Sequence, residues 1–269
     1  MIRPPAVAGR FYPENATKLG ELVDSLVATS NPDAKIRVRA CLVPHAGYLY
    51  SGGVAGAVYG GIEIPEHIIL IGPRHYPRGA AAAILSEGAW QTPLGLAQID
   101  QSLAAKIMAV SPLLQEDAEA HGAEHSIEVQ LPFLQRLAAS FRFVPIVIGP
   151  VQFTDLEDLG KAIANVIAAE KESVLIVASS DMNHYESDAV TRTKDRMAVE
   201  HILALDARGL FDTVRNEDIS MCGYGAAVVM LTAALQLDWM QGELIRYATS
   251  GEINGDMQEV VGYAGAVVF

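Results

Sequence analysis

Three histidines follow separate apolar runs of the sequence, and neutral imidazole is the commonest protein ligand for iron, copper and zinc. They are His45, His75 and His184, each in a segment rich in Gly, Pro, Asn or Asp. The apolar runs are typical of buried strands, and α/β proteins bind ligands beyond the carboxyl ends of such strands. The shared placement predicts a metal or acid–base site. The alternative for each histidine is a hydrogen bond within its own loop.

Two other residues could serve the same site. Asp181 stands three positions before His184 and could orient it or share its proton transfer, whereas the alternative is a turn-capping carboxylate. Cys222 lies just before an apolar helical pattern, where helix amides would stabilise a metal-binding thiolate. The alternative for Cys222 is a small apolar residue at the start of a helix.

His125 belongs to a dense polar cluster, HGAEHSIE, at positions 121–128. If a helix begins near Ser126, Glu124 and Glu128 would flank His125 and could raise its pKa. We therefore predict a supporting acid or base at His125. A solvated, capped helix start would account for the same pattern.

These residues need a scaffold, and the sequence alternates between strand and helix patterns. Continuous apolar runs at 38–44, 67–72, 143–149 and 173–178 predict strands buried on both faces, and 81–86, 96–100, 243–248 and 263–268 predict further strands. Helical patterns occupy 126–139 with a kink at Pro132, 154–170 with Thr154 as cap, 188–205, 210–214 and 226–237. The alternation predicts one α/β domain over 1–269, with a mostly parallel or mixed sheet flanked by helices.

Composition excludes several classes of function. Lys and Arg number 19 and Asp and Glu number 32, so the net charge of −13 argues against nucleic-acid binding and anionic membrane surfaces. With two cysteines a disulfide scaffold is not expected. We predict a reduced, cytoplasmic protein with Cys41 in the core. The start of the chain has no signal-peptide pattern, and no apolar run is long enough to span a membrane.

Familiar catalytic motifs are absent from the sequence, which contains no GxGxxG, GxxxxGK[ST], HExxH, CxxC or GxSxG. The glycines at 51–56 have the wrong spacing for a dinucleotide loop and are expected to permit close helix packing.

Taken in order, the motifs resemble those of the Memo family over nearly the whole chain. The matching segments are RPPAVAGRFYP at 3–13, VPHAGY at 43–48, YSG at 50–52, GPRH at 72–75, TPLG at 92–95, EHSIEVQLP at 124–132, SSDMNHY at 179–185 and MCGYG at 221–225. The closest kin resemble microbial members, called protein B of a system that also contains a radical-SAM protein and a small AMMECR-type protein. The resemblance implies a fold like that of the extradiol ring-cleaving dioxygenases, which use non-haem iron(II).

The resemblance also implies a metal site. His45, His75 and Cys222 match the metal-binding residues of the family, and Asp181 and His184 match further polar residues of the pocket. Cys222 stands where the dioxygenases use a carboxylate, so the family relation does not by itself transfer ring cleavage.

Three hypotheses follow. The first is a redox-active oxidoreductase with iron(II) or copper, zinc being possible, in which His184, Asp181 and His125 act on protons of an unknown substrate. His184 could instead be a further metal ligand. The second is a non-enzymatic module whose pocket aromatics, such as Tyr12, Tyr48 and Tyr185, hold a peptide or protein. The third is a metal-dependent hydrolase, which would use a metal-bound water.

Overall fold

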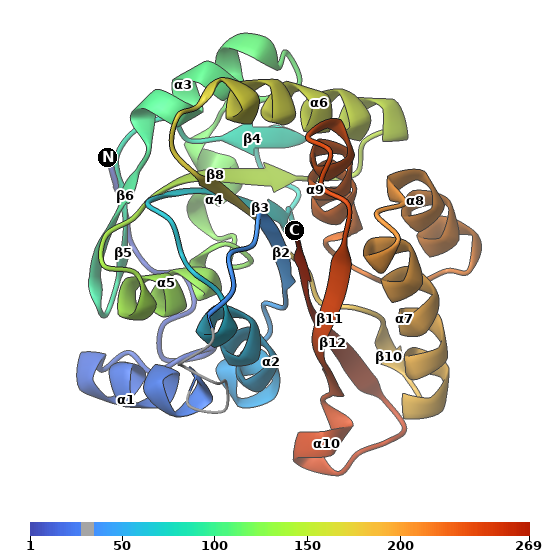
Figure 1. The fold of residues 1–269 in the computed structure, drawn as a ribbon. Coiled ribbons are helices and arrows are strands. Elements are labelled where there is room, and N and C mark those ends of the chain that lie inside the picture. Colours follow the sequence, from blue (N-terminus) through green and yellow to red (C-terminus); the bar gives the residue numbers. More distant parts are fainter. Residues whose placement is uncertain (28–34) are drawn as a thin grey trace.

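Four parallel strands form the centre of the molecule (Figure 1). The structure is a computed structural model that describes residues 1–27 and 35–269. The central strands lie side by side in the order β8 (Arg142–Ile148), β3 (His67–Pro73), β9 (Val174–Ser179) and β2 (Ala40–Val43). All three contacts between them are parallel. These strands correspond to the four apolar runs expected to be buried, so their carboxyl ends share one edge of the sheet.

Further strands extend the sheet on both sides. Beyond β8 lie β6 (Gly95–Ile99), β5 (Ala89–Thr92) and β1 (Ile2–Arg3), and beyond β2 lie β12 (Val260–Val268), β10 (His184–Glu186) and β11 (Gly242–Thr249). The short strand β4 (Ala82–Ile84) pairs with β8, and β7 (Gln115–Glu116) pairs with β4. In the described part of the chain this is a mixed sheet of twelve strands. The predicted α/β class is confirmed.

Each central strand supplies side chains to two hydrophobic cores. In β3, Ile69 and Ile71 belong to one core, whereas Ile68 and Leu70 belong to the core on the opposite face. Successive strand residues point to opposite faces, so a sheet covered on both faces requires apolar residues without interruption. This requirement explains why the four runs do not alternate with polar residues.

Helices cover both faces of the sheet (Figure 1). One core includes side chains from α3 (Gln101–Val110), α6 (Phe153–Ala169), α7 (Asp188–Leu203), α8 (Ala207–Asn216) and α9 (Tyr224–Gln236). The other includes side chains from α1 (Ala16–Val27), α2 (Tyr48–Gly61), α4 (Ala118–Gly122) and α5 (Leu131–Leu137). A short helix, α10 (Gly251–Asn254), precedes the last strand. Within the described ranges no helix combines the length and the apolar character needed to cross a bilayer.

Two glycines let α2 approach α1 closely. A Cβ atom at Gly56 would lie 2.5 Å from the backbone oxygen of Leu26, and one at Gly52 would lie 2.8 Å from a Leu26 methyl carbon. The expectation that this glycine-rich segment permits close helix packing is therefore confirmed.

Two details of the predicted helices are wrong. The helix expected over 126–139 is divided into a 3-10 turn (Glu128–Gln130) and α5, and Pro132 lies in the first turn of α5 rather than at a kink. Proline is tolerated there because the first amides of a helix have no partner within it. Helix α6 begins one residue before Thr154. Its preceding residue, Gln152, donates its backbone N–H to the Asp155 carboxylate at 3.1 Å.

Candidate metal centre

Three imidazoles converge at the carboxyl edge of the central strands. The ring centroids of His45 and His75 are 5.2 Å apart, and the ring of His125 lies 4.6 Å from His75 and 5.6 Å from His45. One nitrogen from each ring lies within 4.8 Å of the other two. The Sγ atom of Cys222 is 3.2 Å from Nε2 of His45. Among the described residues, the cluster within 4.8 Å thus comprises His45, His75 and His125, of which His125 was expected only in a supporting role. Cys222, expected as a ligand, is not one of the three and reaches them through its contact with His45.

The chain delivers these residues from distant segments. His45 follows β2, His75 follows β3, and Cys222 lies two residues before α9. His125 comes from the segment between α4 and the 3-10 turn, whose Ser126 hydroxyl donates to the backbone oxygen of Pro73 at 3.1 Å. Ser126 therefore joins this segment to the end of β3 and does not cap a helix.

The hydrogen bonds around His45 define its tautomer. Nδ1 of His45 is 2.9 Å from the hydroxyl oxygen of Ser179, which also lies 2.7 Å from the backbone oxygen of Ser126. Ser179 has one hydroxyl proton, and the Ser126 carbonyl can only accept it. Nδ1 of His45 must therefore donate to Ser179, which leaves the lone pair of Nε2 directed toward Cys222.

The carboxylate of Glu124 forms hydrogen bonds with the other two histidines, His75 and His125. Its carboxylate accepts from the backbone N–H of His75 at 2.6 Å and contacts Nδ1 of His75 at 2.9 Å. It also accepts from the backbone N–H groups of His125 (2.8 Å) and Ser126 (2.9 Å). A fully buried carboxylate with four such bonds fixes the His75 ring and leaves its Nε2 free. Sequence reasoning placed Glu124 beside His125 but missed its bond to His75, 49 residues away.

The environment keeps most of these imidazoles neutral. Burial lowers the pKa of His45 well below its usual value, and the neighbouring histidines lower it further. Burial also lowers the pKa of His125 to about 4, against the attraction of Glu124. The flanking acids Glu124 and Glu128 do raise this pKa, as predicted, but desolvation outweighs them and the net shift is downward. His75 differs: burial opposes its charging, but the hydrogen bond and the charge of Glu124 prevail and raise its pKa.

The surroundings of Cys222 favour its protonated thiol form in the metal-free protein. Burial and the nearby Asp181 raise its pKa, so the expected stabilisation of a thiolate at the helix start is wrong for this state. The cause is desolvation, which disfavours the charged form of the thiol. A bound cation would act in the opposite direction, because metal ions are ligated by the thiolate. Cys41 is fully buried in the core, as predicted.

Asp181 and His184 line the same pocket but do not contact each other by any described hydrogen bond. The Asp181 carboxylate accepts from the backbone N–H groups of His45 (2.7 Å) and Ala46 (3.2 Å), and burial raises its pKa to about 6. His184 instead places Nδ1 2.9 Å from the backbone oxygen of Ser220, and burial lowers its pKa. Asp181 thus orients the His45 segment rather than the His184 ring.

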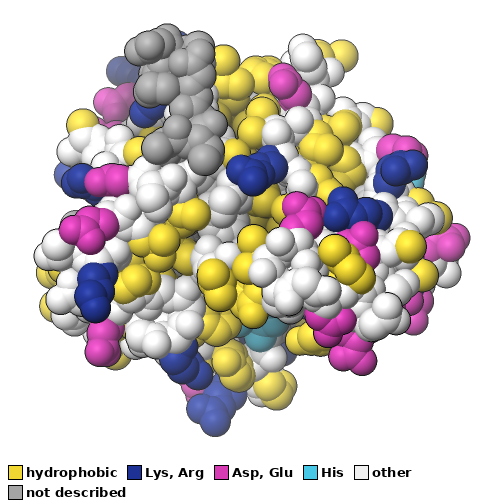
Figure 2. Space-filling view, turned by 90° about the horizontal axis from the view of Figure 1, so that it is seen from below, with side chains coloured by type: hydrophobic (Ala, Val, Ile, Leu, Met, Phe, Trp, Pro, Cys, Tyr) yellow, Lys and Arg dark blue, Asp and Glu magenta, His cyan; other side chains and the backbone are white. Residues whose placement is uncertain are grey.

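The pocket that contains these groups has a volume of about 570 Å³. Its aromatic walls are Phe11, Tyr185 and Tyr263. Tyr12 and Tyr48, expected as pocket aromatics, are instead buried in the core and bonded to Glu128 and to a backbone oxygen. On the face seen from below, histidine atoms lie recessed among apolar side chains (Figure 2).

A buried ion pair brings the start of the chain to this pocket. Glu128 accepts from the guanidinium of Arg3 at 2.7 Å, from the Tyr12 hydroxyl at 2.6 Å and from two backbone N–H groups of residues 6 and 7. The segment between residues 7 and 12 places Phe11 edge-on against His125, with ring centroids 4.8 Å apart. Sequence reasoning missed this role of Glu128 because its partners lie more than a hundred residues away.

Comparison with known families now adds to the geometry. The family model described as Memo-like protein matches residues 3–267. The chain belongs to the Memo family. A MEMO1 family protein from Methanopyrus kandleri is 38% identical to this Memo-family chain over 283 residues. The alignment covers 100% of this chain and 99% of the relative. A MEMO1 family protein from Aquifex aeolicus is 41% identical over 267 residues, which cover 99% of this chain and 98% of the relative.

A solved structure shares the fold. An uncharacterised protein from Escherichia coli K12 superposes with a TM-score of 0.56 over 86% of this Memo-family chain and 100% of its own. Its sequence identity is 13%, so the similarity concerns the fold alone.

Proposed function

We propose that this Memo-family protein binds one transition-metal ion and is a redox-active oxidoreductase. The observation that carries the proposal is the convergence of the His45, His75 and His125 nitrogens beside the Cys222 thiol in one pocket. Imidazole and thiolate together favour iron, copper or zinc over calcium and magnesium, which prefer oxygen ligands. Iron(II) or copper is the ion we favour for redox chemistry.

The residues fit such an ion in three respects. His45 is held as a neutral ring with the Nε2 lone pair directed into the cluster, which is the form that ligates metal. His75 is oriented through Nδ1 by a carboxylate, as metal-binding histidines commonly are. The Nδ1 atom of His125 is buried and has no hydrogen-bond partner among the described residues. These residues would hold the ion, with Cys222 as the thiolate ligand.

A bound iron or copper ion would supply one-electron redox chemistry and Lewis acidity. The surrounding residues would manage protons for the substrate. Asp181, with a pKa near 6, and His184, whose Nε2 makes no hydrogen bond in the described part of the chain, line the same cavity. Each could give or accept a proton there. Phe11 and Tyr263 line the same cavity.

Metal analysis of purified protein tests this proposal. Wild-type protein is expected to carry close to one equivalent of metal, and the His45→Ala/His75→Ala double variant is expected to lose it. A His201→Ala variant changes a histidine outside the pocket and should match the wild type. Circular dichroism verifies folding. Equal metal content in the wild type and the double variant would sink the proposed site.

One observation favours a second function, the capture of a peptide or protein. Tyr185 at the pocket rim is 74% exposed and has a φ of 61°, a left-handed conformation that is rare for a bulky residue. Such strain is typical of binding sites. A partner whose affinity survives metal removal and the Cys222→Ser substitution, but falls in Tyr185→Ala, would support binding without catalysis.

A further inference from the structure

The metal pocket contains a carboxylate oxygen that no described residue uses. The Asp181 side chain is 5% exposed, and both of its described hydrogen bonds, from the backbone N–H groups of His45 and Ala46, reach Oδ1. Its Oδ2 atom accepts no hydrogen bond from any described residue, yet it retains solvent-accessible surface in the pocket that Asp181 lines. A ligand in this pocket can therefore donate a hydrogen bond to Oδ2.

His184 supplies a second acceptor to the same pocket. Its Nδ1 atom is 2.9 Å from the backbone oxygen of Ser220, which can only accept, so Nδ1 carries the proton. Burial lowers the pKa of this imidazole, so the ring is neutral and Nε2 offers a lone pair. No hydrogen bond from the described part of the chain reaches Nε2. Two open acceptors, one of them a carboxylate, favour a ligand that carries several hydrogen-bond donors.

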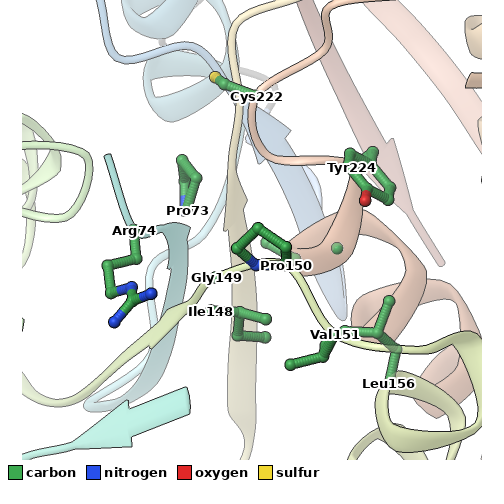
Figure 3. A pocket seen from close by; sticks show the side chains of 11 residues that line it. Pro73, Arg74, Ile148, Gly149, Pro150, Val151, Leu156, Cys222 and Tyr224 are labelled. Carbon is green, nitrogen blue, oxygen red and sulfur yellow. The ribbon is translucent and has the colours of Figure 1, made fainter. Parts of the chain in front are cut away.

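No cationic side chain faces Asp181 from the pocket wall. The described lining contains no Lys or Arg, and its one imidazole with a raised pKa, His75, already pairs with Glu124. Arg74 directly precedes His75, but Figure 3 shows its guanidinium directed away from Cys222, where it lines a separate cavity of about 120 Å³. An anionic ligand would thus lack a free counter-charge in the pocket, whereas a cationic ligand would neutralise Asp181.

Aromatic side chains lie near this carboxylate. Tyr185 and Tyr263 line the pocket together with Asp181. Burial raises the pKa of Tyr263, and the charges of Asp181 and Tyr185 raise it further, which places both groups near its hydroxyl. The face of an aromatic ring attracts a cation, and proteins recognise organic ammonium ions by combining such faces with negative charge.

We propose that this pocket binds an organic ammonium ion, a protonated amine on an apolar body, with the amine at Asp181 and the body against Tyr185 and Tyr263. The N–H donors of the amine match Oδ2 of Asp181 and Nε2 of His184. The pocket volume of about 570 Å³ lies within the range of sites for small organic ligands. That the amine is a substrate rests on the proposed oxidoreductase function, whereas the amine site itself does not require the metal.

Titration calorimetry of the metal-free full chain with benzylammonium and benzyl alcohol tests the proposal. The two probes share the benzyl group and differ in the charge of the donor. The pKa of Asp181 is about 6, so the experiment is done at pH 8, where the carboxylate is ionised. The wild type is expected to bind one benzylammonium per chain, about tenfold or more tightly than benzyl alcohol, because hydrogen bonds to charged groups are the stronger ones.

Asp181→Asn retains an acceptor for the two backbone N–H groups but replaces Oδ2 by an NH₂ donor. The preference for benzylammonium over benzyl alcohol should fall about tenfold in this variant. Asp218→Asn makes the same change at an exposed acid outside the pocket and should retain the wild-type preference. Circular dichroism checks that both variants fold.

Backbone amide NMR of the wild type decides the matter if Asp181→Asn does not fold. Benzylammonium should shift the signals of Ala46 and Tyr185, which line the pocket, and leave that of His201, outside it, unchanged. The proposal is overturned by the absence of saturable binding, by equal affinity for the two probes, by wild-type preference in a folded Asp181→Asn variant, by an equal loss in Asp218→Asn, or by shifts that spare the pocket.

Failure of the amine site and failure of the proposed function can be told apart. Benzylammonium is titrated into metal-free protein, so a chain that binds it but never carries metal would retain the amine site and lose the oxidoreductase function. A chain that carries metal at the histidine cluster but shows no preference between the two probes would lose only the amine site.

Discussion

Replacing Glu124 by glutamine is the most informative single change at the candidate metal centre. The substitution keeps the size of the side chain but removes its charge and one acceptor atom. Oε1 of Glu124 faces three donors, from His75, His125 and Ser126, while Oε2 accepts from the backbone N–H of His75. A glutamine can present its oxygen to only one of these two groups and must turn an NH₂ group toward the other.

The energetic cost follows from these contacts. If the amide oxygen takes the place of Oε1, the buried backbone N–H of His75 loses its acceptor, at about 1–3 kcal/mol. The remaining bonds lose their charge assistance as well, so we expect a total loss of about 2–4 kcal/mol near pH 6. Metal affinity should fall about 10- to 100-fold, the range typical for residues that orient a ligand histidine.

The pH dependence has a defined sign. Although burial opposes ionisation, the bonds from His75 and the backbone lower the pKa of Glu124, so its contribution to stability is present above about pH 4.5 and is lost as the pH falls through the folded value. The raised pKa of His75 contributes stability that is fully present below about pH 6.5 and is lost as the pH rises through the folded value. The difference between wild type and variant should therefore be largest between about pH 4.5 and 6.5.

Urea unfolding of the metal-free proteins from pH 3 to 8 measures this difference, and titration calorimetry with iron(II) or copper measures the affinity. Glu119→Gln is the matched control, because Glu119 is an exposed acid of the preceding helix. The reasoning is refuted if Glu124→Gln unfolds at the wild-type urea concentration throughout this range and binds metal as tightly as the wild type.

Two further predictions concern the scaffold. Burial raises the pKa of Asp195 to about 7, so its folded form retains a proton that the unfolded chain releases from about pH 4, and stability falls as the pH rises between these values. Asp195→Asn should remove this decline, which amounts to up to about 4 kcal/mol of the free energy of unfolding. If the urea midpoints of the two proteins change in parallel between pH 4 and 8, the prediction is wrong. Gly56→Ala should destabilise the protein by about 1–3 kcal/mol because its Cβ meets the Leu26 backbone oxygen, whereas Gly20→Ala, with no atom within 4 Å, should stabilise by about 0.5–1 kcal/mol. If Gly56→Ala and Gly20→Ala shift the thermal midpoint in the same direction, the packing argument is refuted.

The sequence by itself determined the strands and the general position of the site. Runs such as 67–72 and 173–178 are apolar without interruption because both faces of these strands are buried, and that property is local and visible in the letters. Parallel strands place their carboxyl ends on one edge, so His45 and His75 could be expected to meet there. The position of Cys222 before an apolar helical pattern made it a candidate, and the family motifs added its match to a metal-binding residue.

The tertiary structure alone decided the chemistry of the individual groups. The contact of Cys222 with His45 joins residues 177 positions apart, and the pair of Glu128 with Arg3 spans 125. No local pattern encodes such separations. The pKa of His125 and that of Cys222 moved opposite to the predicted direction because burial, which is a property of the whole fold, outweighs the neighbours that the sequence makes visible.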